Sequence, residues 1–167
     1  MNKTLIALVF LLFAIPARGA QSLGVAVVPQ QKPLPTSRHI VKAFDLAYNT
    51  GCRTVQMGWT WKSLELSPGV FNLTDVSNTL SYIEARGFDV ILNIQVLNTN
   101  IKETPPDLLG VSFADDAMKS RFRALLDALQ PYLTARVRSI SVGNEVDAFL
   151  NTYPWEWTPY GVRQIRR

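Results

Sequence analysis

Short apolar runs alternate with amphipathic stretches along this chain. Four of the runs have the length and composition of strands, and they cover residues 23–28, 53–59, 88–94 and 137–142. The first of them, LGVAVV, suits a strand that is buried on both faces. The stretches between them carry apolar residues at helical spacing. Because strands that alternate with helices pair in parallel through right-handed crossovers, the pattern predicts an α/β fold around a parallel sheet.

Three helices are expected from this spacing, at about residues 37–50, 75–86 and 115–130. Thr36 or Ser37 can cap the first helix, and Gly51 lies just past its end, where a left-handed residue is favoured. Gly87 stands in the same position after the second helix. A fourth helix is expected to open within the segment PWEWTPYGVRQ, residues 154–164.

Two architectures fit this order of elements, an open doubly wound sheet and part of an eight-stranded barrel. No Gly-x-Gly-x-x-Gly follows the first strand, so the nucleotide-binding version of the open sheet lacks its fingerprint. The loops after the strands are long and rich in Trp, Asn, Gln and Pro, whereas those after the helices are short. Since barrel enzymes place their chemistry on the loops after the strands, we expect a partial TIM (β/α)8 barrel, about its first four strand–helix units.

The first twenty residues, MNKTLIALVFLLFAIPARGA, have the features of a signal peptide. The apolar run at residues 5–15 is shorter than the roughly 20 residues that cross a bilayer. Ala17-Arg18-Gly19 fits a small-x-small cleavage site. An uncleaved anchor is the alternative. We therefore expect residues 21–167 to form a secreted or periplasmic protein that has no membrane contact after leader cleavage.

The composition restricts the chemistry further. Of the 167 residues, 47% are hydrophobic and 18% are charged, which favours a folded domain with a core over a disordered chain. The net charge is +4, but no basic stripe with interleaved aromatics is present, so no nucleic-acid partner is expected. Cys52 and His39 are the only residues of their kinds. A disulfide within this chain, a cysteine zinc site and a two-histidine metal motif are therefore excluded, and we expect no metal or other cofactor.

Amides, indoles and acids gather where the predicted strands end. They are Gln56, Trp59, Trp61, Asn93, Gln95, Asn98, Asn144, Glu145 and Asp147. Amides and acids can hydrogen-bond hydroxyl groups, and indole faces can stack on the C–H faces of sugar rings. No lysine or histidine is among them. The collection is therefore better suited to a neutral polyol than to a phosphate or a carboxylate.

Two stretches carry a family resemblance, SVGNEVDAF and GWTWKSLELSPGVFNLTDVSNTLSYIEARGFDVILNI. They resemble the N-terminal half of the retaining glycoside hydrolases of the large (β/α)8 clan, in which Asn-Glu ends strand four. The second stretch is similar to that family's aromatic strand end, followed by Glu-x-x-Pro-Gly-x-aromatic, a helix, Gly and a hydrophobic strand. The galactosidase- and galactanase-type branches are the most similar. The resemblance covers roughly residues 23–160 and implies a secreted O-glycosyl hydrolase that acts on a β-glycan or oligosaccharide.

The resemblance also implies roles for two neighbouring residues. Glu145 would be the general acid/base, which protonates the glycosidic oxygen and later activates water, and Asn144 would hydrogen-bond the 2-hydroxyl of the sugar. The alternative for Glu145 is a solvated carboxylate at the start of a loop or helix.

The remaining candidates would bind the substrate. We expect one of Trp59 and Trp61 to stack on a sugar ring, with packing in the core or a loop as the alternative. Gln95 and Asn98 are expected to line the site, because loops after strands carry function in this fold. Glu65 is expected to support the loop before Pro68-Gly69 rather than take part in the chemistry.

Two departures from the family pattern matter. Gln56 lies in a stretch where much of the clan has an arginine that reaches the nucleophile. The family's nucleophile is a second glutamate at the end of strand seven. A complete barrel needs about 250 residues, whereas this sequence has 167. We therefore expect an incomplete fragment that is inactive alone and that self-associates or needs its missing C-terminal half. The alternatives are a non-catalytic carbohydrate-binding or assembly module and an unrelated exported α/β domain.

Overall fold

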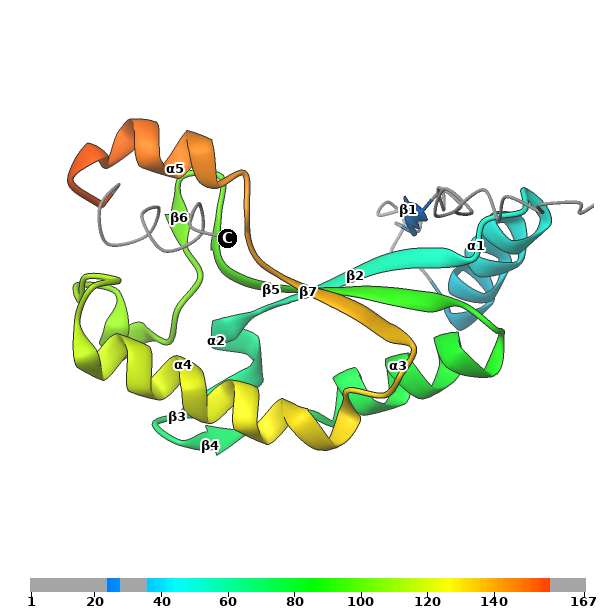
Figure 1. Ribbon diagram of the computed structural model, residues 1–167, viewed down its shortest axis with the longest axis horizontal. Helices are drawn as coiled ribbons and strands as arrows, with labels where there is room; N and C mark the ends of the chain where they lie inside the picture. The colour runs from blue at the N-terminus through cyan, green and yellow to red at the C-terminus, as the bar shows by residue number, and fades with distance from the viewer. Residues whose placement is uncertain (1–23, 28–35, 157–167) are drawn as a thin grey trace, which may run out of the picture.

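The structure, a computed structural model, describes residues 24–27 and 36–156. Within these residues the main sheet contains four parallel strands, arranged in the order in which they follow along the chain (Figure 1). They are β1 (Gly24–Ala26), β2 (Thr54–Thr60), β5 (Asp89–Asn98) and β7 (Val137–Asn144). β6 (Ile101–Lys102) folds back antiparallel onto the end of β5. The predicted α/β fold with a parallel sheet is confirmed.

Three long helices follow the first three parallel strands, as the hydrophobic spacing predicts. They are α1 (Ser37–Asn49), α3 (Thr74–Ala85) and α4 (Asp116–Leu129). Their ends carry residues that are typical of helix ends. The Asp115 side chain accepts a hydrogen bond from the backbone N–H of Ala117 at 2.8 Å, and Gly51 and Gly87 follow α1 and α3 with φ of 88° and 79°, the left-handed conformation that glycine adopts without a Cβ penalty.

Several short elements lie in the loops, most of them after strands and one, at Gln130–Tyr132, after α4. A turn of helix and a two-stranded hairpin follow β2, and a seven-residue helix follows β7. The short elements are α2 (Trp61–Leu64), β3 (Glu65–Ser67), β4 (Val70–Phe71), η1 (Pro106–Leu108), η2 (Gln130–Tyr132), α5 (Val146–Thr152) and η3 (Pro154–Glu156). The predicted fourth helix is a 3-10 turn over its first three residues, and its remainder lies outside the described residues, as does the predicted signal peptide.

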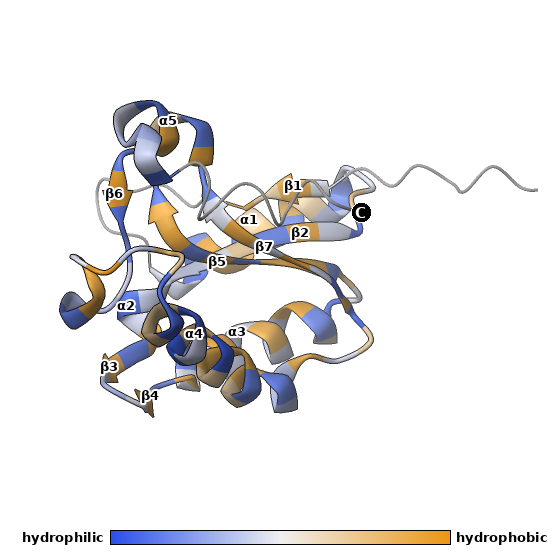
Figure 2. Ribbon diagram, turned by 60° about the vertical axis from the view of Figure 1, so that its left-hand side comes forward, coloured by the Kyte–Doolittle hydropathy of each residue, from blue (hydrophilic) through white to orange (hydrophobic). Residues whose placement is uncertain are grey.

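The two faces of the sheet differ in polarity. Val55, Leu92 and Ile94 belong to a buried apolar cluster together with residues of α1, α3 and α4, and α3 and α4 lie along one side of the sheet (Figure 2). The alternate residues form polar rows across the strands, in which Gly58 pairs with Asn93 and Asn93 with Ser141. Because successive side chains of a strand point to opposite faces, one face packs against helices and the other carries amides and hydroxyls.

Among the described residues, no helix combines the length and hydrophobicity that a bilayer crossing requires.

Candidate functional site

The carboxyl ends of β5 and β7 are joined by side-chain and backbone hydrogen bonds. Asn98 and Asn144 are partners in the parallel ladder, and the Asn144 Nδ2 donates to Asn98 Oδ1 at 2.8 Å. The backbone N–H of Thr99 donates to the carbonyl of Asn144 at 3.1 Å. The two amides that the sequence placed at separate strand ends are therefore in direct contact.

Glu145 follows at once, in a left-handed backbone conformation with φ of 50° and ψ of 47°. Its side chain is exposed, and its Oε2 accepts a hydrogen bond from the Thr99 hydroxyl at 2.6 Å. Such a short bond to a carboxylate is of the stronger kind. The carboxylate is thus open to solvent but held toward the end of β5.

Thr99 shares the unusual backbone of Glu145. Its φ is 54°, and among the described residues these two are the only non-glycine residues with positive φ. A β-branched residue in this region is a genuine outlier, and backbone strain of this kind persists only where the surroundings enforce it, often at functional sites. The sequence analysis missed Thr99. Its position directly after a long apolar strand was the only available signal.

The amides of β5 lie on the polar face of the sheet that runs up to this site. Gln95 is half-buried and pairs with Thr60 in the ladder. Asn93 is 3% exposed, and its Oδ1 has no hydrogen-bond partner among the described residues. A Cβ at Gly58 would lie 3.3 Å from Gln95 Nε2, so a glycine on β2 gives the Gln95 side chain its room. These amides offer hydrogen-bonding capacity on the same face.

The indoles of Trp59 and Trp61, the two candidates for stacking on a sugar, lie away from these amides. Trp61 is 1% exposed, donates from Nε1 to Glu65 Oε2 at 2.7 Å, and packs edge-on against Phe122. Its ring offers no open face to a sugar, so core packing, the alternative, describes Trp61. Trp59 is half-buried and donates from Nε1 to Asp75 at 2.7 Å.

Trp59 also lines a groove of about 490 Å³ between α1 and α3. In the ladder it pairs with Ile94, a residue of the buried cluster. The groove therefore opens on the helix-covered side of the sheet, away from the amide rows. Stacking of Trp59 on a sugar stays a prediction.

An ionic cluster around the buried carboxylate of Glu65 supports the loop after β2. Glu65 Oε1 accepts hydrogen bonds from the backbone N–H of Gly69 and from Arg121 Nε, both at 2.7 Å. Arg121 also pairs with Asp107 at 2.9 Å. Burial alone would lower the pKa of the Arg121 guanidinium, but the hydrogen bonds to Asp107 and Glu65 outweigh it and raise that pKa. These contacts agree with the expectation that Glu65 supports the Pro68-Gly69 turn.

No group of three or more His, Cys, Asp or Glu side chains within the described residues is placed to hold a metal ion. Cys52 is a buried free thiol.

Comparisons with known proteins relate this fold to glycoside hydrolases. No family model matches the chain, and no curated protein sequence matches it. An exo-β-1,4-mannosidase from Opitutaceae bacterium strain TAV5 aligns with a TM-score of 0.64 and 23% identity, over 76% of this chain and 25% of the mannosidase. A GH5_18 protein from Bifidobacterium longum subsp. longum, solved in complex with Manβ1-4GlcNAc, aligns with a TM-score of 0.58 and 16% identity, over 70% of this chain and 34% of its own.

A family 39 glycoside hydrolase from Bacteroides cellulosilyticus WH2 aligns with a TM-score of 0.52 and 17% identity, over 81% of this chain and 29% of that one. Identities this low show the fold alone. The chain has a mixed α/β fold, with a parallel sheet and helices, similar to that of TIM-barrel glycoside hydrolases. It spans between a quarter and about a third of the length of these three structures.

Proposed function

We propose that this chain is part of a secreted glycosidase, a retaining hydrolase of O-glycosyl bonds in β-linked glycans or oligosaccharides, with Glu145 as its general acid/base. One observation carries the proposal. The Glu145 carboxylate is exposed at the end of the fourth parallel strand and is held there by the Thr99 hydroxyl at 2.6 Å. The similarity of the fold to that of glycoside hydrolases supports it, and the leader sequence supports export.

The geometry suits the chemistry of a general acid/base. A carboxyl group that protonates a glycosidic oxygen must be reachable by the substrate yet fixed in direction, and Glu145 is both exposed and hydrogen-bonded. Asn144, directly before it, would bond the 2-hydroxyl of the sugar, a contact that strengthens in the transition state. The Asn98 oxygen already accepts from Asn144 Nδ2, which orients the amide. Gln95 and Asn98 would extend this polar lining.

A retaining mechanism needs a second carboxylate about 5–5.5 Å from the first. The next acid along the chain, Asp147, lies in the first turn of α5 rather than at the end of a strand. The proposed nucleophile is a glutamate at the end of strand seven, in the part of a (β/α)8 barrel that this chain does not span. We accordingly propose that the chain forms part of a barrel and is inactive without the remainder.

Manβ1-4GlcNAc and β-1,4-mannobiose are the first substrates to test, because the similar structures include an exo-β-1,4-mannosidase and a protein in complex with Manβ1-4GlcNAc. The resemblance to galactosidase- and galactanase-type branches makes β-1,4-galactobiose the third. The assay uses the full-length protein, which on this proposal contains this chain together with the remainder of the barrel. It compares the wild type with Glu145→Gln and with Asp147→Asn, which changes an exposed acid on α5.

We expect Glu145→Gln to lower kcat by about 10²–10⁴-fold, the contribution of a general acid or base, while sugar binding is kept and Asp147→Asn stays close to wild type. Equal turnover in wild type and Glu145→Gln would contradict the assigned role. Binding without turnover in the wild type would instead indicate a carbohydrate-binding module.

A further inference from the structure

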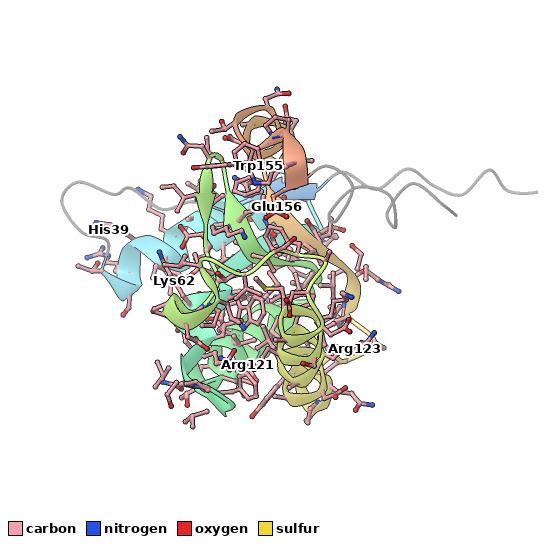
Figure 3. The ribbon with its side chains drawn as sticks, turned by 90° about the vertical axis from the view of Figure 1, so that its left-hand side faces the viewer. His39, Lys62, Arg121, Arg123, Trp155 and Glu156 are labelled. Carbon is pink, nitrogen blue, oxygen red and sulfur yellow. The ribbon has the colours of Figure 1, made fainter. Side chains whose placement is uncertain are left out.

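A separate pocket of about 290 Å³ opens between the β5–β6 turn and the end of α5. Among the residues that line it are Asn100, Lys102, Tyr153, Trp155 and Glu156. Figure 3 shows Trp155 and Glu156 next to each other at the end of the molecule where α5 and β6 lie. The proposed mechanism uses none of these five residues.

Trp155 gives the pocket an open apolar face. Its side chain is 70% exposed, although tryptophan is among the largest apolar residues. The Tyr153 ring packs against it edge-on, with a distance of 5.5 Å between the ring centroids. The Tyr153 ring in turn lies 4.8 Å from that of Phe149, which is buried in the core. The indole therefore forms a supported platform rather than an isolated surface side chain.

Fixed polar groups also line the pocket. Lys102 Nζ donates to the carbonyl of Val111 at 2.7 Å and to Glu156 Oε1 at 3.3 Å. Glu156 is 6% exposed, and its Oε2 accepts from the Ser112 hydroxyl at 3.3 Å. Because the cation and the carboxylate neutralise each other, the pocket favours a neutral polar ligand. A neutral ring with one apolar face and hydroxyl groups at its edge, as in a pyranose sugar, matches this combination.

Two elements, the β5–β6 turn and α5, connect the pocket to Glu145. Asn100 lines the pocket, and its neighbour Thr99 holds the Glu145 carboxylate. Glu145 also begins α5, whose far end leads into Tyr153. The seven residues of α5 rise about 10 Å at 1.5 Å per residue, so Tyr153, which follows the helix, lies more than one sugar ring away from Glu145.

We infer that this pocket is a second sugar subsite, in which a pyranose ring stacks on Trp155, and that the substrate is an oligosaccharide long enough to reach it from Glu145. This inference rests on the proposed function, because it assigns the substrate length of the same glycosidase site. A monosaccharide bound beside Glu145 would not reach the pocket, whereas a trisaccharide would occupy both places.

The test is calorimetric binding to the full-length protein carrying Glu145→Gln, which prevents turnover. The ligands are β-1,4-mannotriose, β-1,4-galactotriose, mannose and galactose, and the pocket variants are Trp155→Ala and Trp155→Phe. Leu66→Ala on β3 is the matched control, because Leu66 is also exposed, at 66%, and lies on the hairpin after β2. Circular dichroism checks that each variant is folded.

Trp155→Ala is expected to raise the Kd of the trisaccharide that binds about ten-fold and to leave the Kd of the matching monosaccharide unchanged. Trp155→Phe, which keeps an aromatic face, and Leu66→Ala should stay within about three-fold of the parent. In the Glu145→Gln parent, which does not turn the ligand over, bound trisaccharide should protect Trp155 from oxidation by N-bromosuccinimide.

Two failures are distinguishable. If wild type hydrolyses a trisaccharide but Trp155→Ala binds it with unchanged Kd, and Trp155 is not protected, the subsite is overturned and the glycosidase function stands. If no sugar binds and none is hydrolysed, the proposed function is overturned and the subsite with it.

Discussion

The ion pair between the buried Glu65 and the partly buried Arg121 gives the best test of how the loop after β2 is held. The Glu65 side chain is fully buried, and Arg121 Nη2 lies 2.6 Å from its Oε1. Trp61 and the backbone of Gly69 donate to the same carboxylate. Arg121→Met would remove the cation but leave these two neutral donors.

The expected cost follows from the burial. Removing one partner of a buried ion pair costs about 3–5 kcal/mol, because the remaining charge is left uncompensated. We expect Arg121→Met to lower the free energy of unfolding by about 3 kcal/mol, the lower end of this range, because two hydrogen bonds to the Glu65 carboxylate remain. That loss would be a large fraction of the roughly 5–15 kcal/mol by which a domain is stable. The double variant Glu65→Gln/Arg121→Met should recover much of it, because no buried charge remains.

The assay is urea unfolding of the full-length protein at pH 7, followed by tryptophan fluorescence. Lys119→Met on the same helix is the control. Its partner Asp116 has a 99% exposed side chain, and an exposed pair is worth about 0–1 kcal/mol. An Arg121→Met cost below 1 kcal/mol, or a double variant no more stable than the sum of the single changes, would refute the reasoning.

Two further predictions concern the ends of β5. Thr99→Val should lower kcat about ten-fold, which corresponds to about 1.4 kcal/mol in the activation barrier, with KM unchanged, because the 2.6 Å hydrogen bond that orients Glu145 is lost. Thr99→Ser keeps the hydroxyl and should have close to the wild-type rate. A rate for Thr99→Ser as low as that of Thr99→Val would argue against positioning by the hydroxyl. Hydrogen bonding from Arg138, followed by its charge and by Arg136, lowers the pKa of Asp89, so Asp89 contributes stability above its unfolded pKa that is lost as pH falls through its folded pKa. In urea unfolding, Asp89→Asn should therefore destabilise the protein by at most about 1 kcal/mol at pH 7, and the difference from wild type should shrink as the pH falls below about 4; a pH-independent difference would exclude this linkage.

The helices and strands that the sequence predicts are those with a long, regular period. α1, α3 and α4 have 12–14 residues each, enough for the apolar spacing to show, and their cap residues mark the ends. α5, with seven residues, is too short for its period to be recognised, and it begins at Glu145 without a capping side chain. Short helices and hairpins in the loops depend on tertiary contacts that no local pattern reveals.

The candidate site divides in the same way. The meeting of Asn98, Asn144 and Glu145 is predictable, because the carboxyl ends of parallel strands share one edge of the sheet. The burial of Trp61 is not, since it depends on a carboxylate that Arg121 neutralises from a helix 56 residues further along the chain. Apart from its position directly after a long apolar strand, nothing in the sequence marks Thr99, because its role arises from a strained turn that only the folded β5–β6 connection creates.

The most direct test of the central claim is the leaving-group dependence of the Glu145→Ala variant of the full-length protein. A general acid protonates the departing oxygen, so its loss should harm substrates with poor leaving groups most. If Glu145 is the acid/base, bond cleavage in Manβ1-4GlcNAc should fall about 10²–10⁴-fold, while cleavage of the dinitrophenyl glycoside of the same sugar, whose leaving group needs no proton, should fall far less. An equal loss for both substrates, or no loss for either, would contradict the assignment of Glu145.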